Sequence, residues 1–519
     1  MARVPAESRP IVWSIAGSDS GGAAGLSADQ RAADAFGVHL SPVVAAVTAQ
    51  NSRAVVRVEP VRPELLEAQL ASLEDDLPPH AVKTGLLGSA ELVEVVARRI
   101  DRLRSRRPVA LVVDPVLAAS TGAFFADENA RRAYRALLLP RADLVTPNRR
   151  EAEALAGTAL AAPALAAELR SLGAGAVCVT GGDDAGEGAL ALDWVDTDHA
   201  RGWLALPRID TAHTHGTGCT FATSAAAALA LDFAAADALV LAKMATAGAL
   251  QRGYRAGQGA GPVRASTGFA GDPRLLPSMS FDAVPPQPPA ARTVVRGQAQ
   301  LYAIVDRAAL VRAVVAAGVK IVQLRIKQSE QAHLREQVRA SVEECRAGGA
   351  RLFVNDYWQL AKEAGADGVH LGQEDLAALG PDGRQSLADS GLALGVSSHC
   401  LWELARATAM APEYIACGPV WPTGTKAMPW REQGLGNLAW WCAIAPRPVA
   451  AIGGILTAEQ ARAAASCGAR YVCMLRAIAE HPHAAVPPVL DALRAASADL
   501  RIAAPELPST TILSKTRNA

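Results

Sequence analysis

The chain has 519 residues, half of them hydrophobic, and its 51 Lys and Arg balance its 51 Asp and Glu. This length is enough for about two to four domains, each with its own core, and the balanced charge excludes a global basic field that would recruit nucleic acid or an anionic membrane. We therefore expect small-molecule partners, no nucleic acid and no membrane, and the composition is compatible with a homo-oligomer.

The cysteines and the N-terminal residues point to a reducing compartment. Eight cysteines are scattered without a Cys-x-x-Cys motif or a paired framework, which favours reduced thiols over disulfides or structural zinc. Residues 1–10 are polar and lack the apolar core of an export signal, and the richest apolar helix is interrupted by Asp232 and Asp237. The expected location is therefore cytoplasmic.

Short apolar runs alternate with helical patterns through the first half of the chain. Residues 11–16 form such a run, a glycine-rich turn follows at 17–25, and residues 27–36 are amphipathic. Further strands are predicted at residues 43–48, 81–83, 110–113, 144–146 and 176–180. This alternation predicts an α/β layered domain with a mainly parallel sheet, in which ligands lie at the carboxyl ends of the strands.

A second glycine-rich loop, residues 214–220, precedes an Ala-rich helix predicted over residues 221–231. Gly216 and Gly218 allow the backbone to approach an anion, and the amides of the first helical turn point at it. Cys219 lies in that turn, where we expect the helix to lower the thiol pKa and make the group a base or a nucleophile. The alternative is a buried cysteine next to a helix cap, and a short glycine motif alone does not decide between them.

Polar residues follow two further strands of this half. Asn148 and Glu151 come after the strand at 144–146, and Gly181 and Gly182 after the strand at 176–180. An Asn-x-x-Glu pair suits a hydrated Mg²⁺, which keeps most of its waters and accepts one or two carboxylates. The alternative is a helix N-terminus with an acidic residue in its first turn.

Residues 282–292 contain four prolines and no apolar period, which indicates an extended connector. We place the domain boundary there, between a first domain at 10–270 and a second at 296–500. The second half is predicted to contain strands at residues 301–306, 321–327, 351–356, 368–371, 394–398, 414–419, 449–453 and 471–475. Eight strand–helix repeats predict a (β/α)₈ TIM barrel with its site on the carboxyl-end loops.

Charged residues follow several of these barrel strands. Asp356 and Asp375, from neighbouring strands, are suited to hold one hard cation, and Arg325, Lys327 and Lys426 would face an anion such as pyrophosphate beside it. The alternative is a solvated rim of ion pairs. Two glycines, Gly453 and Gly454, follow the seventh strand, where barrels often bind a phosphate. His370 is expected to be a satisfied core histidine.

The motifs of the first half together resemble a known family. Residues 11–256 are similar to the hydroxymethylpyrimidine and phosphomethylpyrimidine kinases of thiamine synthesis, which are ribokinase-like enzymes. The resemblance rests on AGSDSGGAAG at 16–25, VTAQ at 47–50, VDPV at 113–116, TPNRRE at 146–151 and HGTGCT at 215–220. It implies ATP as co-substrate and Mg²⁺ as cofactor.

The resemblance also implies roles for single residues. Asp29 and Gln50 would hold the aminopyrimidine, and Cys219 stands where most ribokinase-like enzymes carry an aspartate base. Gly216 and Gly218 would stabilise the transferring phosphoryl group. The cofactor-binding residues would be Asn148, Glu151, Gly181 and Gly182. The same fold supports a vitamin B6-type kinase, which remains one alternative for this domain. Thr180 and Ala119 stand where lysines are often found, so a non-catalytic pyrimidine-binding or regulatory module remains another.

Residues 300–480 resemble thiamine-phosphate synthase. The resemblance rests on QLRIK at 323–327, VND at 354–356, GVHLGQED at 368–375, LGVS at 394–397, GPVWPTGTK at 418–426 and AIGGI at 451–455. It implies that the pyrimidine diphosphate is bound by Gln323, Arg325, Lys327, Asn355, Ser397, Thr425 and Lys426. It further implies that Asp356 and Asp375 bind Mg²⁺, and that Thr423, Gly453 and Gly454 serve the thiazole phosphate. Arg476 departs from the family, which usually has serine there.

These two resemblances predict a bifunctional enzyme of thiamine synthesis. Its first half would phosphorylate the pyrimidine and its phosphate with ATP, and its second half would condense the diphosphate with thiazole phosphate.

Overall fold

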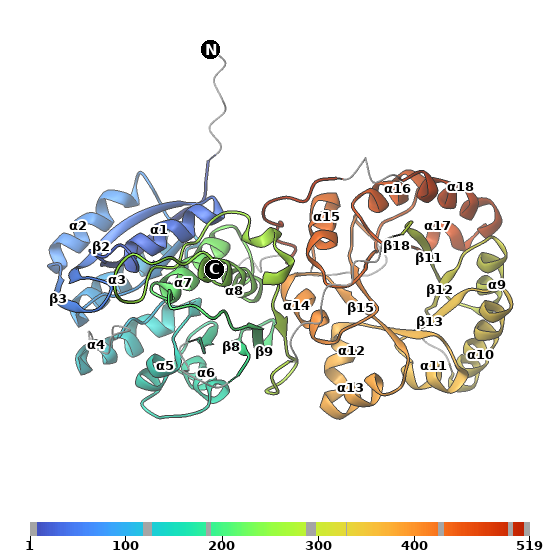
Figure 1. The fold of residues 1–519 in the computed structure, drawn as a ribbon, viewed down its shortest axis with the longest axis horizontal. Coiled ribbons are helices and arrows are strands. Elements are labelled where there is room, and N and C mark those ends of the chain that lie inside the picture. Colours follow the sequence, from blue (N-terminus) through green and yellow to red (C-terminus); the bar gives the residue numbers. More distant parts are fainter. Residues whose placement is uncertain are drawn as a thin grey trace, which may run out of the picture. The chain divides into compact units, whose positions relative to one another are not determined.

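In the computed structural model the described residues are 8–117, 127–182, 188–286, 297–327, 330–423, 430–496 and 502–512. They fall into two compact units that divide after Pro288 (Figure 1). Part of the proline-rich segment, residues 287–292, lies outside the described residues. Among the described helices, none is both long enough and apolar enough to cross a membrane.

The first unit is built on one ten-stranded sheet. Its strands are β1 (Ile11–Ser18), β2 (His39–Gln50), β3 (Val55–Pro60), β4 (Ala81–Thr84), β5 (Ala110–Val113), β6 (Leu144–Val145), β7 (Val177–Thr180), β8 (Leu190–Asp196), β9 (Arg201–Pro207) and β10 (Ser278–Met279). The order is β10-β9-β8-β7-β6-β5-β4-β1-β2-β3. The six central strands β7, β6, β5, β4, β1 and β2 run parallel. The strands β3, β8, β9 and β10 pair antiparallel at the two edges. The predicted mainly parallel sheet is confirmed.

Helices cover the sheet of the first unit. They are α1 (Gly25–Phe36), α2 (Pro63–Glu74), α3 (Ala90–Arg104), α4 (Glu128–Ala133), α5 (Arg149–Ala156), α6 (Ala162–Ser171), α7 (Thr217–Ala230) and α8 (Ala235–Gln251), with short turns at Tyr134–Leu138, Leu139–Arg141, Phe269–Gly271 and Pro273–Leu275. The Ala-rich α7 packs against α1, α8 and the central strands β1, β4 and β5. The small alanine side chains of α7 let this helix lie close to the three central strands.

The second unit is a closed barrel of eight parallel strands. These are β11 (Gln300–Val305), β12 (Ile321–Leu324), β13 (Arg351–Asn355), β14 (Gly368–Leu371), β15 (Ala393–Ser398), β16 (Tyr414–Cys417), β17 (Val449–Ala451) and β18 (Tyr471–Met474). The outer helices are α9 (Ala308–Ala316), α10 (Gln331–Ala347), α11 (Trp358–Ala364), α12 (Gln373–Ala378), α13 (Gly380–Ala388), α14 (Leu401–Ala409), α15 (Gly434–Ile444), α16 (Ala458–Ser466), α17 (Arg476–Ala479) and α18 (Pro482–Ala495). The predicted TIM barrel is confirmed.

Aromatic rings fill the barrel interior. Tyr302, Phe353 and Tyr414 pack around one another in tilted and edge-on pairs, with ring centroids 5.4–5.9 Å apart. Gly368 and Gly395 make room for them, since a Cβ at Gly395 would lie 2.2 Å from the Tyr414 ring and one at Gly368 would lie 2.5 Å from Phe353. The interior is therefore packed, and ligands are confined to the carboxyl end of the barrel.

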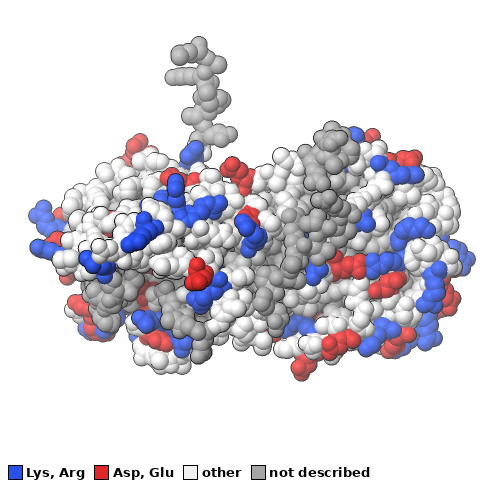
Figure 2. Space-filling view, in the orientation of Figure 1, with Lys and Arg blue, Asp and Glu red and all other residues white. Residues whose placement is uncertain are grey.

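Charges of both signs are interspersed over the face of the molecule shown in Figure 2. This distribution follows from the balanced composition and gives that face no broad field of one sign.

Candidate active sites

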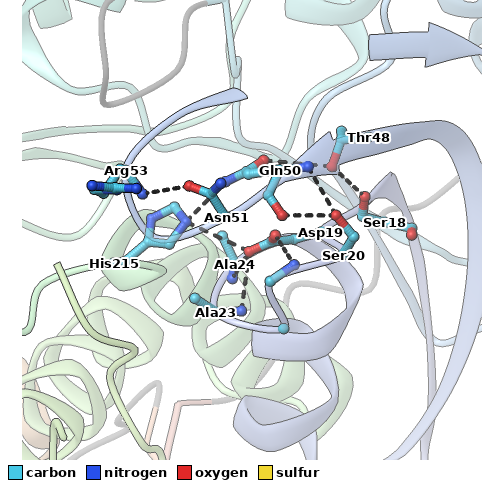
Figure 3. A network of polar contacts seen from close by, with 12 residues as sticks. Ser18, Asp19, Ser20, Ala23, Ala24, Thr48, Gln50, Asn51, Arg53 and His215 are labelled. Carbon is cyan, nitrogen blue, oxygen red and sulfur yellow. Dashed lines mark hydrogen bonds and ion pairs between the residues drawn. The ribbon is translucent and has the colours of Figure 1, made fainter. Parts of the chain in front are cut away.

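The glycine-rich turn after β1 is folded around one carboxylate (Figure 3). Asp19 accepts hydrogen bonds from the backbone amides of Gly21, Ala23 and Ala24 at 2.8, 3.0 and 2.8 Å. Burial favours the neutral acid, but His215 and these amides outweigh it and lower the pKa of Asp19 to about 2. A permanent negative charge thus holds the turn in shape.

Gln50 joins this turn to the loop before α7 (Figure 3). Its Nε2 lies 2.9 Å from Nε2 of His215, and the same imidazole nitrogen lies 3.5 Å from Oδ2 of Asp19. Three motifs that are far apart in the sequence therefore meet at the carboxyl end of β1 and β2. Sequence reasoning selected Gln50 but missed Asp19 and His215, although both lie inside the quoted motifs.

The two glycines of the loop before α7 have different reasons to be glycine. Gly216 has a φ of 89°, and a Cβ there would lie 2.3 Å from the carbonyl oxygen of Ala23, so the fold itself requires glycine. A Cβ at Gly218 would meet no described atom within 4 Å. The absence of a side chain at Gly218 is therefore not required by packing among the described residues, which favours the approach of a ligand.

A buried cluster of charges lies beneath the start of α7. Lys83, on β4, is fully buried and donates to both oxygens of Asp29 at 3.1 and 3.2 Å, and it lies 3.5 Å from Asp114. Burial alone would lower the pKa of Lys83, but Asp29 and Asp114 raise it above its ordinary value. Asp29 also accepts from Ser14 at 2.6 Å and from Thr223 at 2.7 Å.

These contacts change the reading of Asp29. The family resemblance implied a direct contact with an aminopyrimidine, whereas each oxygen of this buried carboxylate already accepts two protein hydrogen bonds. The contacts favour Asp29 as the counter-ion that holds Lys83, with a substrate contact left as a proposal. Burial raises the pKa of Asp114 to about 6, although Lys83 opposes that rise.

Cys219 lies one helical turn before Thr223, on the same face of α7 as the contact to Asp29. The prediction of a lowered thiol pKa is wrong: burial raises the pKa of Cys219 to about 12. Lys83 opposes the rise, and the carboxylates of Asp29 and Asp114 add to it. The dipole at the first turn of a helix is thus outweighed by desolvation and by two nearby negative charges.

The predicted nucleotide residues lie at the ends of β6 and β7. Asn148 and Glu151 form a reciprocal cap of α5, in which each side chain accepts from the other residue's backbone amide at 2.9 Å. This cap explains both side chains without a metal ion, so their cofactor role stays a prediction. The amide of Gly181 donates to Asp193 at 3.1 Å, and the carbonyl of Gly182 accepts from Arg208 at 3.0 Å.

In the barrel, a chain of buried hydrogen bonds connects two of the predicted substrate residues. Gln323 Nε2 donates to the hydroxyl of Tyr302 at 3.4 Å, that hydroxyl lies 2.8 Å from the one of Tyr414, and Tyr414 contacts His370 Nδ1 at 2.8 Å. The other imidazole nitrogen of His370 lies 2.8 Å from Ser397 Oγ. His370 is thus a satisfied core histidine, as predicted, and it holds Ser397 at the carboxyl end of β15.

Five further predicted residues lie at the carboxyl ends of β12 to β14. Arg325 is half-buried and Lys327 exposed after β12, while Asn355 is buried at the end of β13. Asp356 is exposed and has a φ of 69°, a left-handed conformation that is unusual for a non-glycine residue and often marks a functional position. Asp375 is exposed in the first turn of α12, where its Oδ2 accepts from the amide of Gly372 at 2.9 Å.

These two aspartates are suited to Mg²⁺. β13 and β14 are paired neighbours, and the amide of Asp356 donates to the carbonyl of His370 on β14 at 3.0 Å. Within the described part of the chain no group of three or more His, Cys, Asp and Glu gathers as a metal cage. Mg²⁺ needs no such cage, because it keeps several waters and takes one or two carboxylates. The oxygen donors present therefore fit this ion.

Gly453 and Gly454 form a left-handed turn directly after β17, with φ values of 91° and 70°. The turn packs against the segment after β16, since a Cβ at Gly453 would lie 2.7 Å from Pro419 and one at Gly454 would lie 2.6 Å from Trp421. Thr423 is in that segment and is described, whereas Thr425 and Lys426 lie outside the described residues. Arg476 is exposed in α17.

The burial of His370 predicts a pH dependence. Burial first, and then Arg325 and His399, lower the pKa of His370 from 6.5 to about 4. Between these values the unfolded chain binds a proton that the folded barrel does not, so the barrel should lose stability as the pH falls from 6.5 to 4, by up to roughly 3 kcal/mol. We expect His370→Gln to flatten this dependence in denaturant titrations; an unchanged slope would contradict the assignment.

The two units define the class of protein: a ribokinase-like domain joined to a TIM-barrel domain. The family described as phosphomethylpyrimidine kinase matches residues 19–264, and the one described as thiamine monophosphate synthase matches residues 298–478. The thiamine biosynthetic bifunctional enzyme TH1 (chloroplastic) of Arabidopsis thaliana is 36% identical over 86% of this chain and 85% of its own length.

Relatives of single halves are similar at comparable levels. A hydroxymethylpyrimidine/phosphomethylpyrimidine kinase of Synechococcus elongatus is 41% identical over 49% of this chain and 96% of its own length. A thiamine-phosphate synthase of Rhizobium etli is 45% identical over 35% of this chain and 87% of its own length. The chain therefore belongs to the family of bifunctional thiamine biosynthetic enzymes, and the pyrimidine-kinase assignment of its first half is supported over the vitamin B6-type alternative.

Proposed function

We propose that the two units act in sequence on one pyrimidine. The first unit transfers phosphoryl groups from ATP to hydroxymethylpyrimidine and then to its phosphate, and the second condenses the diphosphate with thiazole phosphate, releasing thiamine phosphate and pyrophosphate. One observation carries the proposal: Asp19, Gln50, His215 and the start of α7 meet at the carboxyl end of β1 and β2.

In the kinase, the pyrimidine would lie beside Gln50, whose amide can pair with a donor–acceptor edge. Cys219 would take the proton of the hydroxymethyl group, and the amides after Gly216 would stabilise the transferring phosphoryl group, which requires positioning and charge neutralisation above all. Because the thiol pKa is about 12, Cys219 would act as the thiolate only in a small fraction of molecules at neutral pH. Asn148, Glu151, Gly181 and Gly182 would face the ATP phosphates.

In the synthase, Gln323, Asn355 and Ser397 would orient the pyrimidine diphosphate, and Arg325 and Lys327 would hold the departing pyrophosphate. Bound to Asp356 and Asp375, Mg²⁺ would neutralise part of that negative charge. Loss of pyrophosphate leaves a pyrimidine methyl cation, which the nitrogen of the thiazole traps. Gly453, Gly454 and Thr423 would hold the thiazole phosphate so that this nitrogen faces the cation.

The experiment that tests the proposal supplies the full chain with hydroxymethylpyrimidine, ATP, Mg²⁺ and thiazole phosphate. We expect thiamine phosphate to form, and pyridoxal to be a poor competitor for the kinase. Product that forms only from supplied pyrimidine diphosphate would contradict the kinase half and favour a pyrimidine-binding module.

Asp356→Asn is predicted to lower synthase activity by about 10²-fold or more, even with supplied pyrimidine diphosphate, because one carboxylate near the pyrophosphate is lost. Asparagine tolerates the left-handed backbone at this position, so the change removes the charge and keeps the turn. The measurement is the rate of thiamine phosphate formation across a Mg²⁺ titration. Asp382→Asn, an exposed change in α13, is the matched control, and wild-type rates in Asp356→Asn at low Mg²⁺ would rule out this site.

A further inference from the structure

The segment 502–512 returns from the end of the chain to the loops at the carboxyl end of the barrel. Its first contact is from the amide of Ile502 to the carbonyl of Ser466, at the end of α16, at 3.2 Å. Ser509 then exchanges two hydrogen bonds with the side chain of Asn437 in α15, at 2.8 and 2.9 Å. The segment is thus held along the outside of the barrel by specific polar pairs.

The last described residues of this segment are buried against the barrel. Thr511 and Ile512 are 4% and 5% exposed. The Thr511 hydroxyl donates to the carbonyl of His399 at 2.7 Å, and the Thr511 carbonyl accepts from the amide of Arg431 at 2.7 Å. Ile512 pairs with Trp430 as an antiparallel bridge. These contacts lie immediately next to β15 and to the segment that begins α15.

The residues contacted by the segment continue into the loops that we propose to hold the thiazole phosphate. Gln433, two residues after Arg431, donates through its backbone to the carbonyl of Pro419 at 2.7 Å, and its side chain donates to the same His399 carbonyl as Thr511 at 2.6 Å. Beyond Pro419, the amide of Trp421 donates to the carbonyl of Gly453 at 3.1 Å. A continuous series of hydrogen bonds therefore runs from Thr511 to the turn after β17.

His399 is the point where this series meets β15. It follows Ser398, its imidazole stacks on Trp430 with an angle of 4° between the rings, and its Nδ1 lies 2.8 Å from Glu403. The two donors on its carbonyl come from Gln433 and Thr511, so the backbone two residues after Ser397 is fixed partly by the C-terminal segment.

We propose that residues 502–512 form a positioning strap for the synthase, which holds the segments 418–423 and 430–434 and thereby the turn at Gly453 and Gly454 in the conformation that receives the thiazole phosphate. The strap acts through Ser509, Thr511 and Ile512, and we assign it no contact with a reacting atom. The inference rests on the proposed synthase function for its kinetic readout, but not for its structural one.

The test compares the full chain with a chain that ends at residue 501. With supplied pyrimidine diphosphate, we expect the shortened chain to show a KM for thiazole phosphate raised by about tenfold, with kcat within about threefold of the parent. A tenfold change corresponds to the binding free energy of one or two hydrogen bonds. Amide hydrogen exchange should become faster in residues 430–437 and stay unchanged in α9 and α10. Unchanged exchange in α9 and α10 is the check on folding of the barrel, and phosphorylation of the pyrimidine by the first unit is the check on the amount of enzyme.

Two point variants separate the strap from general stability. Thr511→Val keeps the shape of the side chain and removes the hydroxyl donated to His399, so it should raise the same KM by about threefold. Glu506→Gln, an exposed change in the same segment, is the matched control and should behave as the parent. Addition of a peptide of residues 502–519 should restore the KM of the shortened chain, and the Thr511→Val peptide should do so less well.

The proposal is overturned if the shortened chain or Thr511→Val keeps the parent KM and the parent exchange in residues 430–437. It is also overturned if the KM for both substrates and the exchange of the whole barrel change together, because that pattern indicates a structural role alone. A full chain that makes no thiamine phosphate from supplied diphosphate contradicts the proposed function, and the exchange measurement then decides on the strap independently.

Discussion

Replacing Cys219 with alanine is expected to lower pyrimidine phosphorylation by about 10²–10⁴-fold, the usual loss for a general base, and to leave the synthase rate from supplied diphosphate unchanged. Cys219 lies in the first turn of α7, beside the glycine loop and one turn from the contact between Thr223 and Asp29. The measurement is the kinase rate with hydroxymethylpyrimidine and ATP, followed separately from thiamine phosphate formation.

The pH profile of the kinase gives a second readout of the same residue. With a thiol pKa near 12, the thiolate fraction rises about tenfold for each pH unit in the neutral range, so log(kcat/KM) should rise with a slope near one. Cys178→Ala, which changes a second thiol of the same unit, buried in β7, is the control. A kinase that keeps its rate in Cys219→Ala would show that the helix amides suffice without the thiol.

Lys83→Met is expected to be the most destabilising single change in the kinase unit. Removing one partner of a buried ion pair typically costs about 3–5 kcal/mol, because the remaining charge stays buried without compensation. Here two carboxylates, Asp29 and Asp114, would lose their common cation. Kinase activity should fall as well, since the cation that opposes the rise in the Cys219 pKa is gone.

The double variant Lys83→Met with Asp29→Asn separates charge from packing. Asparagine keeps the shape of Asp29 without its charge. Its single oxygen can accept from Ser14 or Thr223, and its amide nitrogen can donate to the other hydroxyl, so we expect part of the lost stability to return without the activity. Urea unfolding of the first unit, followed by hydrogen exchange so that the barrel is observed separately, measures both variants. Equal stability of Lys83→Met and the parent would contradict the proposed ion cluster.

Local features of the sequence were sufficient for the architecture and for the placement of most candidate residues. Apolar runs bounded by glycine-rich turns predicted the six parallel strands of the first unit and all eight barrel strands, because a buried parallel strand is apolar on both faces. The strands β3, β8, β9 and β10 were missed. They lie at or near the sheet edges, where an exposed apolar residue such as Val56 and a buried charged residue such as Asp193 interrupt the expected pattern.

The environment of each side chain was decided by tertiary structure. Nothing in the sequence indicated that Lys83 would be fully buried, because its partners Asp29 and Asp114 are brought to it by α1 and by the neighbouring strand β5. The expected effect of the helix on the Cys219 pKa was a local argument. It failed because desolvation and the carboxylates of Asp29 and Asp114, which are distant in sequence but near in space, outweighed the dipole.

The sequence by itself determined which residues are present at the strand ends and that two enzyme-like units share the chain, since hydrophobic period and glycine placement act over a few neighbouring residues. Only the tertiary structure decided which groups meet: Gln50 with His215, Gln323 with Ser397 through three buried side chains, and Thr511 with His399. The physical reason is that burial and hydrogen bonding depend on contacts between segments up to about two hundred residues apart, and no local pattern encodes those pairings.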